Sequence, residues 1–249
     1  MERIRPPRGG FTLVELMVVL GVVMVLAGLT LTGLAGARKA AQSAVCLSNL
    51  RQLAAATADY AAANGAAYPP AQWSDASDPS LVRGWDYTRR GGAAVGAGLL
   101  WPGRASPAVQ QCPAFDGRAQ AAGDPYTGYN YNTSYIGRGT GERVAPPARL
   151  AAVKRPAETL LFGDGQWSLG ANKFMRSPQL SPTETPIGYA DGSAARAAGT
   201  QGYRHRGSTN AVFCDGHAET LGRRFTAANT HVAAGTGFVS EDNTLYDLD

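Results

Sequence analysis

Hydrophobic residues form one long unbroken run near the start of the chain. From Leu16 to Gly36 no side chain is charged. A run of about 20 apolar residues is long enough to cross the hydrocarbon core of a bilayer as an α-helix. The pattern therefore predicts a membrane-spanning helix, with a single carboxylate, Glu15, at the edge of the apolar run.

The helical pattern continues beyond this run, but it becomes amphipathic. Between residues 37 and 64, apolar and small side chains such as Leu50 and Leu53 recur at helical spacing, and polar side chains occupy the other side. Gly65 then ends the pattern, because glycine readily takes the left-handed conformation found after helix ends. We expect one continuous helix from Phe11 to about Asn64.

The rest of the chain reads as a globular head of short strands and loops. A tyrosine-dense stretch at residues 126–135 alternates tyrosine with asparagine at positions 129 to 132, which predicts a half-buried strand. Residues 159–162 predict a short buried strand. The segments 66–109 and 166–202 are rich in glycine, proline and serine, so we expect mainly loops there.

A hairpin is predicted near the end of the head. Asp215-Gly216 lies between two β-prone runs, which is a signal for a two-residue turn. In that register Val212 faces Glu219. We therefore expect an α+β fold, with a long N-terminal helix packed on an antiparallel sheet. The predicted parts are a leader at 1–10, a membrane half of the helix at 11–36, an amphipathic half at 37–64 and a head at 65–249.

Composition and charge limit the partners of the chain. Of its 249 residues, 44% are hydrophobic and 17% are charged, and the part after the helix is long enough for one domain with its own core. The formal charge is +4, and the leader contributes +2 of this through Arg3, Arg5 and Arg8 against Glu2. The basic leader predicts a cytoplasmic N-terminus and a head across the membrane. The remaining basic residues are scattered, so no nucleic-acid partner is indicated.

The segment before the apolar run carries a specific motif. Residues 10–15 read Gly-Phe-Thr-Leu-Val-Glu, which resembles the signal of type IV pilins and type II secretion pseudopilins. The resemblance implies that a prepilin peptidase cuts after Gly10, that Phe11 becomes N-methylated, and that Glu15 pairs with the Phe11 amine of a neighbouring subunit. An unpaired carboxylate in the apolar phase would cost about 2.5–3.5 kcal/mol. A plain signal anchor, with Glu15 among the headgroups, is the alternative.

This resemblance also implies a location and partners. The protein would be stored in the inner membrane with its head in the periplasm, and would then enter an extracytoplasmic pilus or pseudopilus. The implied partners are the prepilin peptidase, an inner-membrane assembly platform, and copies of the chain or related subunits.

Three further segments resemble pilin-like proteins of several environmental bacterial lineages. His205 is separated by nine residues from Asp215-Gly216. Residues 46–52 read Cys-Leu-Ser-Asn-Leu-Arg-Gln, and Cys112 is followed by a proline. Together with the N-terminal signal, these segments extend the resemblance in outline over most of the chain.

Four residues of the head are of types that bind divalent metals, namely Asp164, His205, Asp215 and His217. The competing interpretation is structural, because turn geometry explains Asp215 and a backbone hydrogen bond would explain His205. The structural interpretation is favoured, because no spacing typical of a zinc site is present. Calcium would need more oxygen ligands than these residues supply. No other cofactor is predicted.

The three cysteines suggest a disulfide, because such bonds persist outside the cytoplasm. Cys46 on the buried side of the helix and Cys112 in the head are one candidate pair, and a bridge there would contribute about 2–4 kcal/mol. A Cys112–Cys214 pair and the absence of any bridge are the alternatives, since sequence alone does not determine connectivity.

We predict no enzymatic activity. Cys214 and His217 are close in sequence, but no Gly-x-Ser-x-Gly elbow or phosphate-binding loop is present. The alternative is a membrane-anchored hydrolase or binding protein, which a deep polar pocket around these two residues would favour.

Overall fold

The computed structural model describes residues 10–74, 76–119, 123–137, 146–168, 170–181, 193–226 and 232–249. The predicted leader at residues 1–10 lies outside the described residues except for Gly10. The chain forms two compact units, residues 1–41 and residues 42–249.

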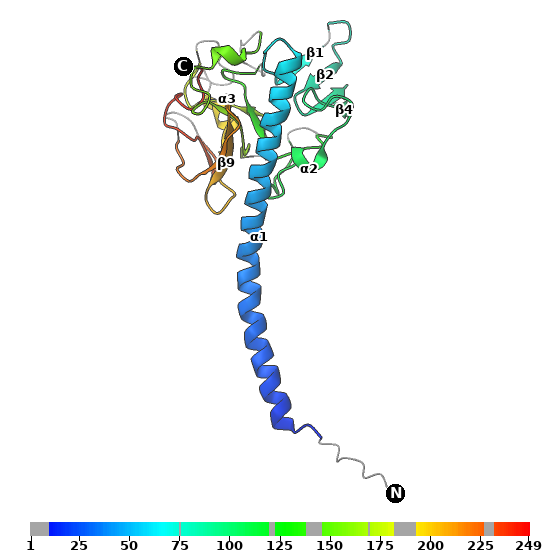
Figure 1. Ribbon diagram of the computed structural model, residues 1–249, viewed down its shortest axis with the longest axis vertical. Coiled ribbons are helices and arrows are strands. Elements are labelled where there is room, and N and C mark those ends of the chain that lie inside the picture. The colour runs from blue at the N-terminus through cyan, green and yellow to red at the C-terminus, as the bar shows by residue number, and fades with distance from the viewer. Residues whose placement is uncertain are drawn as a thin grey trace. The chain divides into compact units, whose positions relative to one another are not determined.

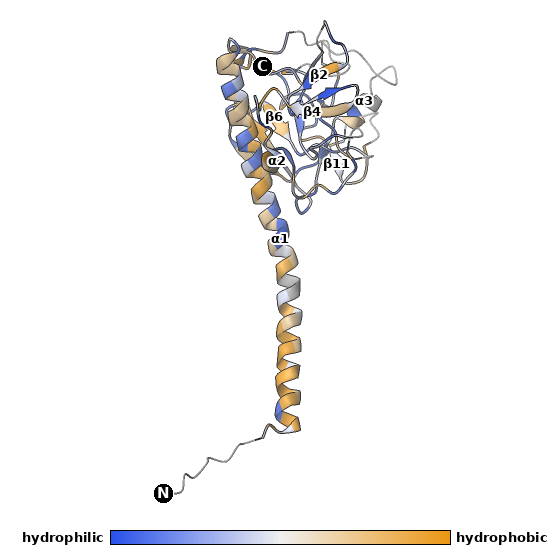
Figure 2. Cartoon of the chain, turned by 90° about the vertical axis from the view of Figure 1, so that its right-hand side faces the viewer, coloured by the Kyte–Doolittle hydropathy of each residue, from blue (hydrophilic) through white to orange (hydrophobic). Residues whose placement is uncertain are grey.

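A single helix, α1 (Leu13–Ala63), accounts for the whole described first unit after Thr12 and continues into the second (Figure 1). Its first part is predominantly hydrophobic, and its later part mixes apolar and polar residues (Figure 2). By length and composition α1 can cross a membrane, with a mean hydropathy of 2.5 over its most apolar 18 residues. The predicted helix is therefore present, and it begins two residues later than expected.

The described residues of the second unit form three sheets. The first is antiparallel, in the order β1 (Gln72–Ser74), β2 (Leu81–Gly84), β3 (Tyr87–Arg90) and β4 (Ala93–Ala97). The second has the order β10 (Ala218–Leu221), β9 (Thr209–Phe213), β6 (Leu160–Gly163), β5 (Asn130–Asn132) and β7 (Phe174–Met175). The third pairs β11 (Thr236–Gly237) with β8 (Gln201–Gly202).

Most strand pairs are antiparallel, and the pair β5–β7 is parallel. Where they are described, the connecting segments contain two short α-helices and one 3₁₀ turn, namely α2 (Pro107–Gln110), α3 (Ser193–Ala198) and η1 (Leu150–Ala152). The predicted α+β class, with a long N-terminal helix and an antiparallel-rich head, is confirmed. The predicted buried strand at 159–162 matches β6, whereas the segment expected to be mainly loops at 66–109 forms the whole first sheet.

Two local predictions are wrong. The strand at 126–135 is not half-buried: its regular part is β5, where Asn130 and Asn132 are as buried as Tyr131. The asparagine amides tolerate burial because they donate to backbone carbonyls, Asn130 to Thr200 at 3.2 Å and Asn132 to Leu160 at 2.9 Å.

The hairpin register also differs by one residue, because Val212 pairs with Ala218 and not with Glu219. The turn has three residues, Cys214 to Gly216, and the last of them has a φ of 91°. A three-residue hairpin of this kind needs a left-handed residue at its end, which glycine supplies.

The main core joins α1 to the head. Leu50 and Leu53 of α1 pack in one buried cluster with Trp85, Tyr131 and Phe162. The rings of Tyr131 and Phe162 stack with centroids 4.8 Å apart, and Trp85 tilts against Phe162 at 5.1 Å. The second part of α1 is therefore an integral element of the head.

We expect Leu50→Ala to lower the free energy of unfolding of the full-length chain in detergent by about 2–5 kcal/mol, because the leucine is fully buried and its truncation leaves a cavity. Chemical denaturation followed by tryptophan fluorescence measures the change. Val45→Ala is the matched control, because Val45 is 46% exposed on the same helix. Equal losses in the two variants would contradict the packing described here.

Candidate functional site

The N-terminal end of α1 is closed by a capping box made of Thr12 and Glu15. The backbone N–H and the hydroxyl of Thr12 both donate to Glu15 Oε2 at 2.8 Å, and the N–H of Glu15 donates to Thr12 Oγ1 at 3.2 Å. This reciprocal arrangement satisfies backbone groups that have no partner inside the helix. Sequence analysis missed this role, although the Thr-x-x-Glu spacing is its known signal.

The predicted processing site directly precedes the capping box. Gly10 and Phe11 lie outside the helix, and the Phe11 side chain is 85% exposed. The bond between them therefore belongs to a non-helical, accessible segment, as a peptidase requires. Large apolar side chains of α1 are also exposed on its whole circumference: Leu13, Val14, Leu16, Met17, Val18, Val19, Leu20, Val22, Val23, Met24, Val25, Leu26 and Leu29.

A second constellation lies inside the head, where four potential metal ligands converge. These are Cys46, Cys112, Asp164 and His205, all buried, and their ligand atoms lie within 4.8 Å of one another. Among the described residues this is the only group of three or more such side chains. We call it the Cys-Cys-Asp-His cluster.

Four separate segments supply the cluster. Cys46 lies on α1, and Cys112 follows α2, where its N–H donates to the Thr127 carbonyl at 3.1 Å. Asp164 directly follows β6, and its N–H donates to the backbone carbonyl of Asn210 in β9 at 3.0 Å.

His205 precedes β9 in a tight turn that pairs it with Ser208. The two central residues of that turn, Arg206 and Gly207, have φ angles of 57° and 84°. Left-handed conformations at both central positions are the feature of a two-residue hairpin turn whose twist matches that of strands. The turn thus fixes the position of His205 relative to β9.

The contacts inside the cluster are short. The Cys46 and Cys112 sulfur atoms are 2.8 Å apart, and His205 Nε2 lies 3.0 Å from Asp164 Oδ2. Arg204 lies at the edge of the cluster, with Nη2 3.6 Å from Asp164 Oδ1. Asp164 Oδ2 also accepts the Asn210 N–H at 2.7 Å.

These contacts change the pKa values of two members of the cluster, Cys112 and His205. A hydrogen bond from the Cys46 thiol, assisted by His205 and Arg204 and opposed by burial, lowers the pKa of Cys112 to about 5. Burial alone would lower the pKa of His205, but hydrogen bonds to Asp164 and Cys112 raise it to about 9. The cluster is therefore a strongly polar site in the interior of the head.

Asp215 and His217 do not join the cluster, although sequence analysis grouped them with Asp164 and His205. They form a separate, partly exposed pair at the β9–β10 turn, with His217 Nδ1 2.6 Å from Asp215 Oδ1. Asp215 also accepts the His217 N–H at 3.0 Å, and the His217 ring stacks on Phe213 at 4.4 Å. Burial opposes ionisation of Asp215, but these hydrogen bonds lower its pKa.

The structure brings together the two cysteines of one candidate pair, Cys46 and Cys112, and both are free thiols. A bridge between them stays a prediction. Cys214 is half-buried in the hairpin turn beside Tyr68, and burial raises its pKa to about 12. A thiol of this kind is a poor nucleophile at neutral pH.

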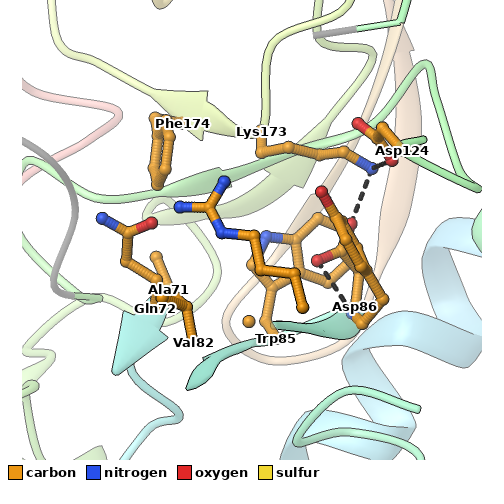
Figure 3. Close-up of a pocket in the computed structure, with 11 residues that line it drawn as sticks. Ala71, Gln72, Val82, Trp85, Asp86, Asp124, Lys173 and Phe174 are labelled. Atoms are coloured by element: carbon orange, nitrogen blue, oxygen red, sulfur yellow. Dashed lines mark hydrogen bonds and ion pairs between the residues drawn. The ribbon is translucent and has the colours of Figure 1, made fainter. Parts of the chain in front are cut away.

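The head also contains a cavity of about 250 Å³ beside the first sheet (Figure 3). Lys173 extends between two carboxylates there, with its Nζ 2.6 Å from Asp86 and 3.2 Å from Asp124. It also donates to the Tyr126 carbonyl. The lining of this cavity includes neither Cys214 nor His217, the two residues considered for a hydrolase.

Comparison with known proteins identifies the N-terminal segment. Residues 5–31 match the family described as the prokaryotic N-terminal methylation motif, which is the signal of type IV pilins and pseudopilins. The match contains Gly10, Phe11 and Glu15. No curated protein and no solved structure matches the chain.

We expect Asp164→Asn to destabilise the head by about 3–5 kcal/mol, because the buried charges of Arg204 and His205 would lose their anion. Thermal or chemical unfolding of the full-length chain measures this loss. Asp215→Asn is the matched control, because Asp215 lies in a partly exposed turn outside the cluster and surface changes usually stay within about 0.5 kcal/mol. A small effect at Asp164 would show that the cluster tolerates an uncompensated cation.

Proposed function

We propose that the protein is a structural subunit of a type IV pilus-like or type II secretion filament. The match of residues 5–31 to the methylation motif is the observation that carries this proposal. In this role a prepilin peptidase cuts after Gly10, the freed amine of Phe11 is methylated, and the mature subunit is stored in the membrane before assembly.

The surface of α1 supports an assembly role. A helix that is apolar on every side is stable only when lipid or protein surrounds it. Between Phe11 and Leu29, α1 and the residues before it expose large apolar side chains on every side. Lipid covers them while the subunit is in the inner membrane, and the helices of neighbouring subunits cover them in a filament core.

Glu15 has a dual role in this proposal. Its hydrogen bonds with described residues use Oε2 and stabilise the start of α1, so within this part of the chain Oε1 is the oxygen left for another donor. In the filament that donor is the methylated amine of Phe11 from a neighbouring subunit. The pair would set the axial register of adjacent helices, since a carboxylate in an apolar core is strongly disfavoured without a cation.

The location and the remaining partners follow from the same reasoning. The head lies in the periplasm and later on the filament, because the basic leader stays in the cytoplasm. The assembly platform and copies of the chain or related subunits are the partners. We assign the head no catalytic role: the raised pKa of Cys214 and the contacts of His217 with Asp215 and Phe213 both argue against a Cys-His nucleophile.

The processing step predicts a defined mature N-terminus. Protein purified from its own membranes should begin at Phe11 and carry one added methyl group, as read by N-terminal sequencing and intact mass. Gly10→Glu should leave the leader attached, because a bulky charged side chain then occupies the position before the cut. Gly9→Ala is the control and should be processed. A wild-type chain that begins at Met1 in cells with an active peptidase would indicate a plain membrane anchor.

The role of Glu15 can be separated from helix capping by two substitutions. Glu15→Gln keeps a side chain that serves in a capping box but removes the charge, so we expect normal membrane levels and at least tenfold fewer subunits in sheared filaments. Thr12→Val removes the cap and keeps the carboxylate, so it should retain most assembly. Immunoblots of filament and membrane fractions measure both. Normal assembly of Glu15→Gln would exclude the proposed ion pair.

A further inference from the structure

The Cys-Cys-Asp-His cluster has the composition of a metal site and is not explained by the filament function. Two sulfur atoms, one imidazole nitrogen and one carboxylate oxygen lie within 4.8 Å of one another. A Cys46–Cys112 disulfide would use only the two sulfurs. It would give no reason for His205 Nε2 and the Asp164 carboxylate to converge on the same point, 3.0 Å from each other.

We propose that the cluster binds one Zn²⁺ ion, with Cys46, Cys112, Asp164 and His205 as its four ligands. Structural zinc sites are tetrahedral and use thiolate, imidazole and carboxylate ligands. Calcium and magnesium are excluded as the preferred ions because they require mainly oxygen ligands. The spacing in sequence gives no zinc motif, since the ligands come from four distant segments.

The distances fit an ion at the centre of the cluster after a small rearrangement. With Zn–N and Zn–O bonds of about 2.0–2.1 Å, a tetrahedron holds nitrogen and oxygen about 3.3 Å apart, close to the 3.0 Å between His205 and Asp164. With Zn–S bonds of about 2.3 Å, the sulfurs would be about 3.8 Å apart. Binding therefore separates Cys46 and Cys112 by about 1 Å from their contact of 2.8 Å.

The surrounding groups provide the second layer of contacts that such sites need. The Asn210 N–H holds Asp164 Oδ2 at 2.7 Å. Tyr129 belongs to the same buried cluster as Cys46 and Cys112, and Asn49 Nδ2 donates to its hydroxyl at 3.2 Å. These contacts orient the ligands on both sides of the cluster.

The charge of the loaded site is balanced. Zn²⁺ displaces to solvent the protons carried by the sulfur atoms and by His205 Nε2. Two thiolates, one neutral imidazole, one carboxylate and the ion then carry a net charge of −1. The largely buried guanidinium of Arg204, with Nη2 3.6 Å from Asp164 Oδ1, would neutralise this charge. The ion would join α1 to three segments of the head, whether or not the chain assembles into a filament.

The test is elemental analysis of the full-length chain purified in detergent without added metal or chelator, combined with intact mass and thiol titration. We expect about one zinc per chain, no mass deficit, and three titratable thiols after unfolding with a chelator. Metal-free chain given Co²⁺ should develop the visible bands of tetrahedral cobalt with thiolate charge transfer.

Variants assign the metal to the cluster. Cys46→Ser and His205→Ala should lose the zinc and the cobalt bands, whereas Cys214→Ser should keep both, because Cys214 is outside the cluster. Far-UV circular dichroism checks that each variant is folded. A chain without zinc that is lighter by two hydrogens and shows one thiol would overturn the proposal in favour of the Cys46–Cys112 disulfide. Zinc retained by all three variants, or a failure of the wild type to bind Zn²⁺ and Co²⁺, would also overturn it.

Discussion

The packing of the later part of α1 into the head is the interaction on which the rest of the structure depends. Leu50 and Leu53 are fully buried, and burial of each such side chain contributes about 1.5–3 kcal/mol. Hydrogen bonds fix the orientation of the helix against the head. Asn49 donates to the carbonyls of Ala108 and Gln111 at 3.1 and 3.3 Å. Asn210 donates to the Ser43 carbonyl at 3.3 Å. The helix thus organises the loops around α2 and the strands of the second sheet together.

The short strands of the head impose a second constraint. Strands of two to five residues leave many backbone carbonyls outside regular ladders, and buried carbonyls need donors. Asparagine and arginine side chains supply these donors in the interior. Asn132 Nδ2 donates to the carbonyls of Leu160 and Tyr246 at 2.9 and 2.8 Å. Arg204 donates to the carbonyls of Gly128 and Gly165. This explains why so many polar side chains are buried in a domain with a small apolar core.

The same constraint separates what the sequence predicts from what it does not. The helix could be predicted because its signal is local, through an apolar run, helical spacing and the stop at Gly65. The burial of Asn130 and Asn132 could not, since polarity normally indicates exposure and their partners are 28 to 114 residues away. The hairpin register failed because Asp-Gly fits both a two-residue and a three-residue turn, and only the cross-strand packing decides between them.

The candidate sites divide in the same way. The N-terminal signal is contiguous, so sequence alone reveals it. The Cys-Cys-Asp-His cluster required the fold, because its members are spread from residue 46 to residue 205. Sequence analysis found all four residues but assigned them to two different sites, the cysteines to a disulfide and the aspartate and histidine to a metal site with Asp215 and His217. Their convergence depends on the turn at Arg206 and Gly207, which no local rule predicted.

The position of the cluster on α1 has a mechanical consequence for the proposed filament. In such a filament the helices form the core, so any axial load reaches the head through the residues where α1 becomes buried. Cys46 is the first buried residue after the second unit begins at Gln42. An ion bound by Cys46, Cys112, Asp164 and His205 would add directional bonds to apolar contacts such as those of Leu50. The cluster therefore lies where an additional link between helix and head would bear load first.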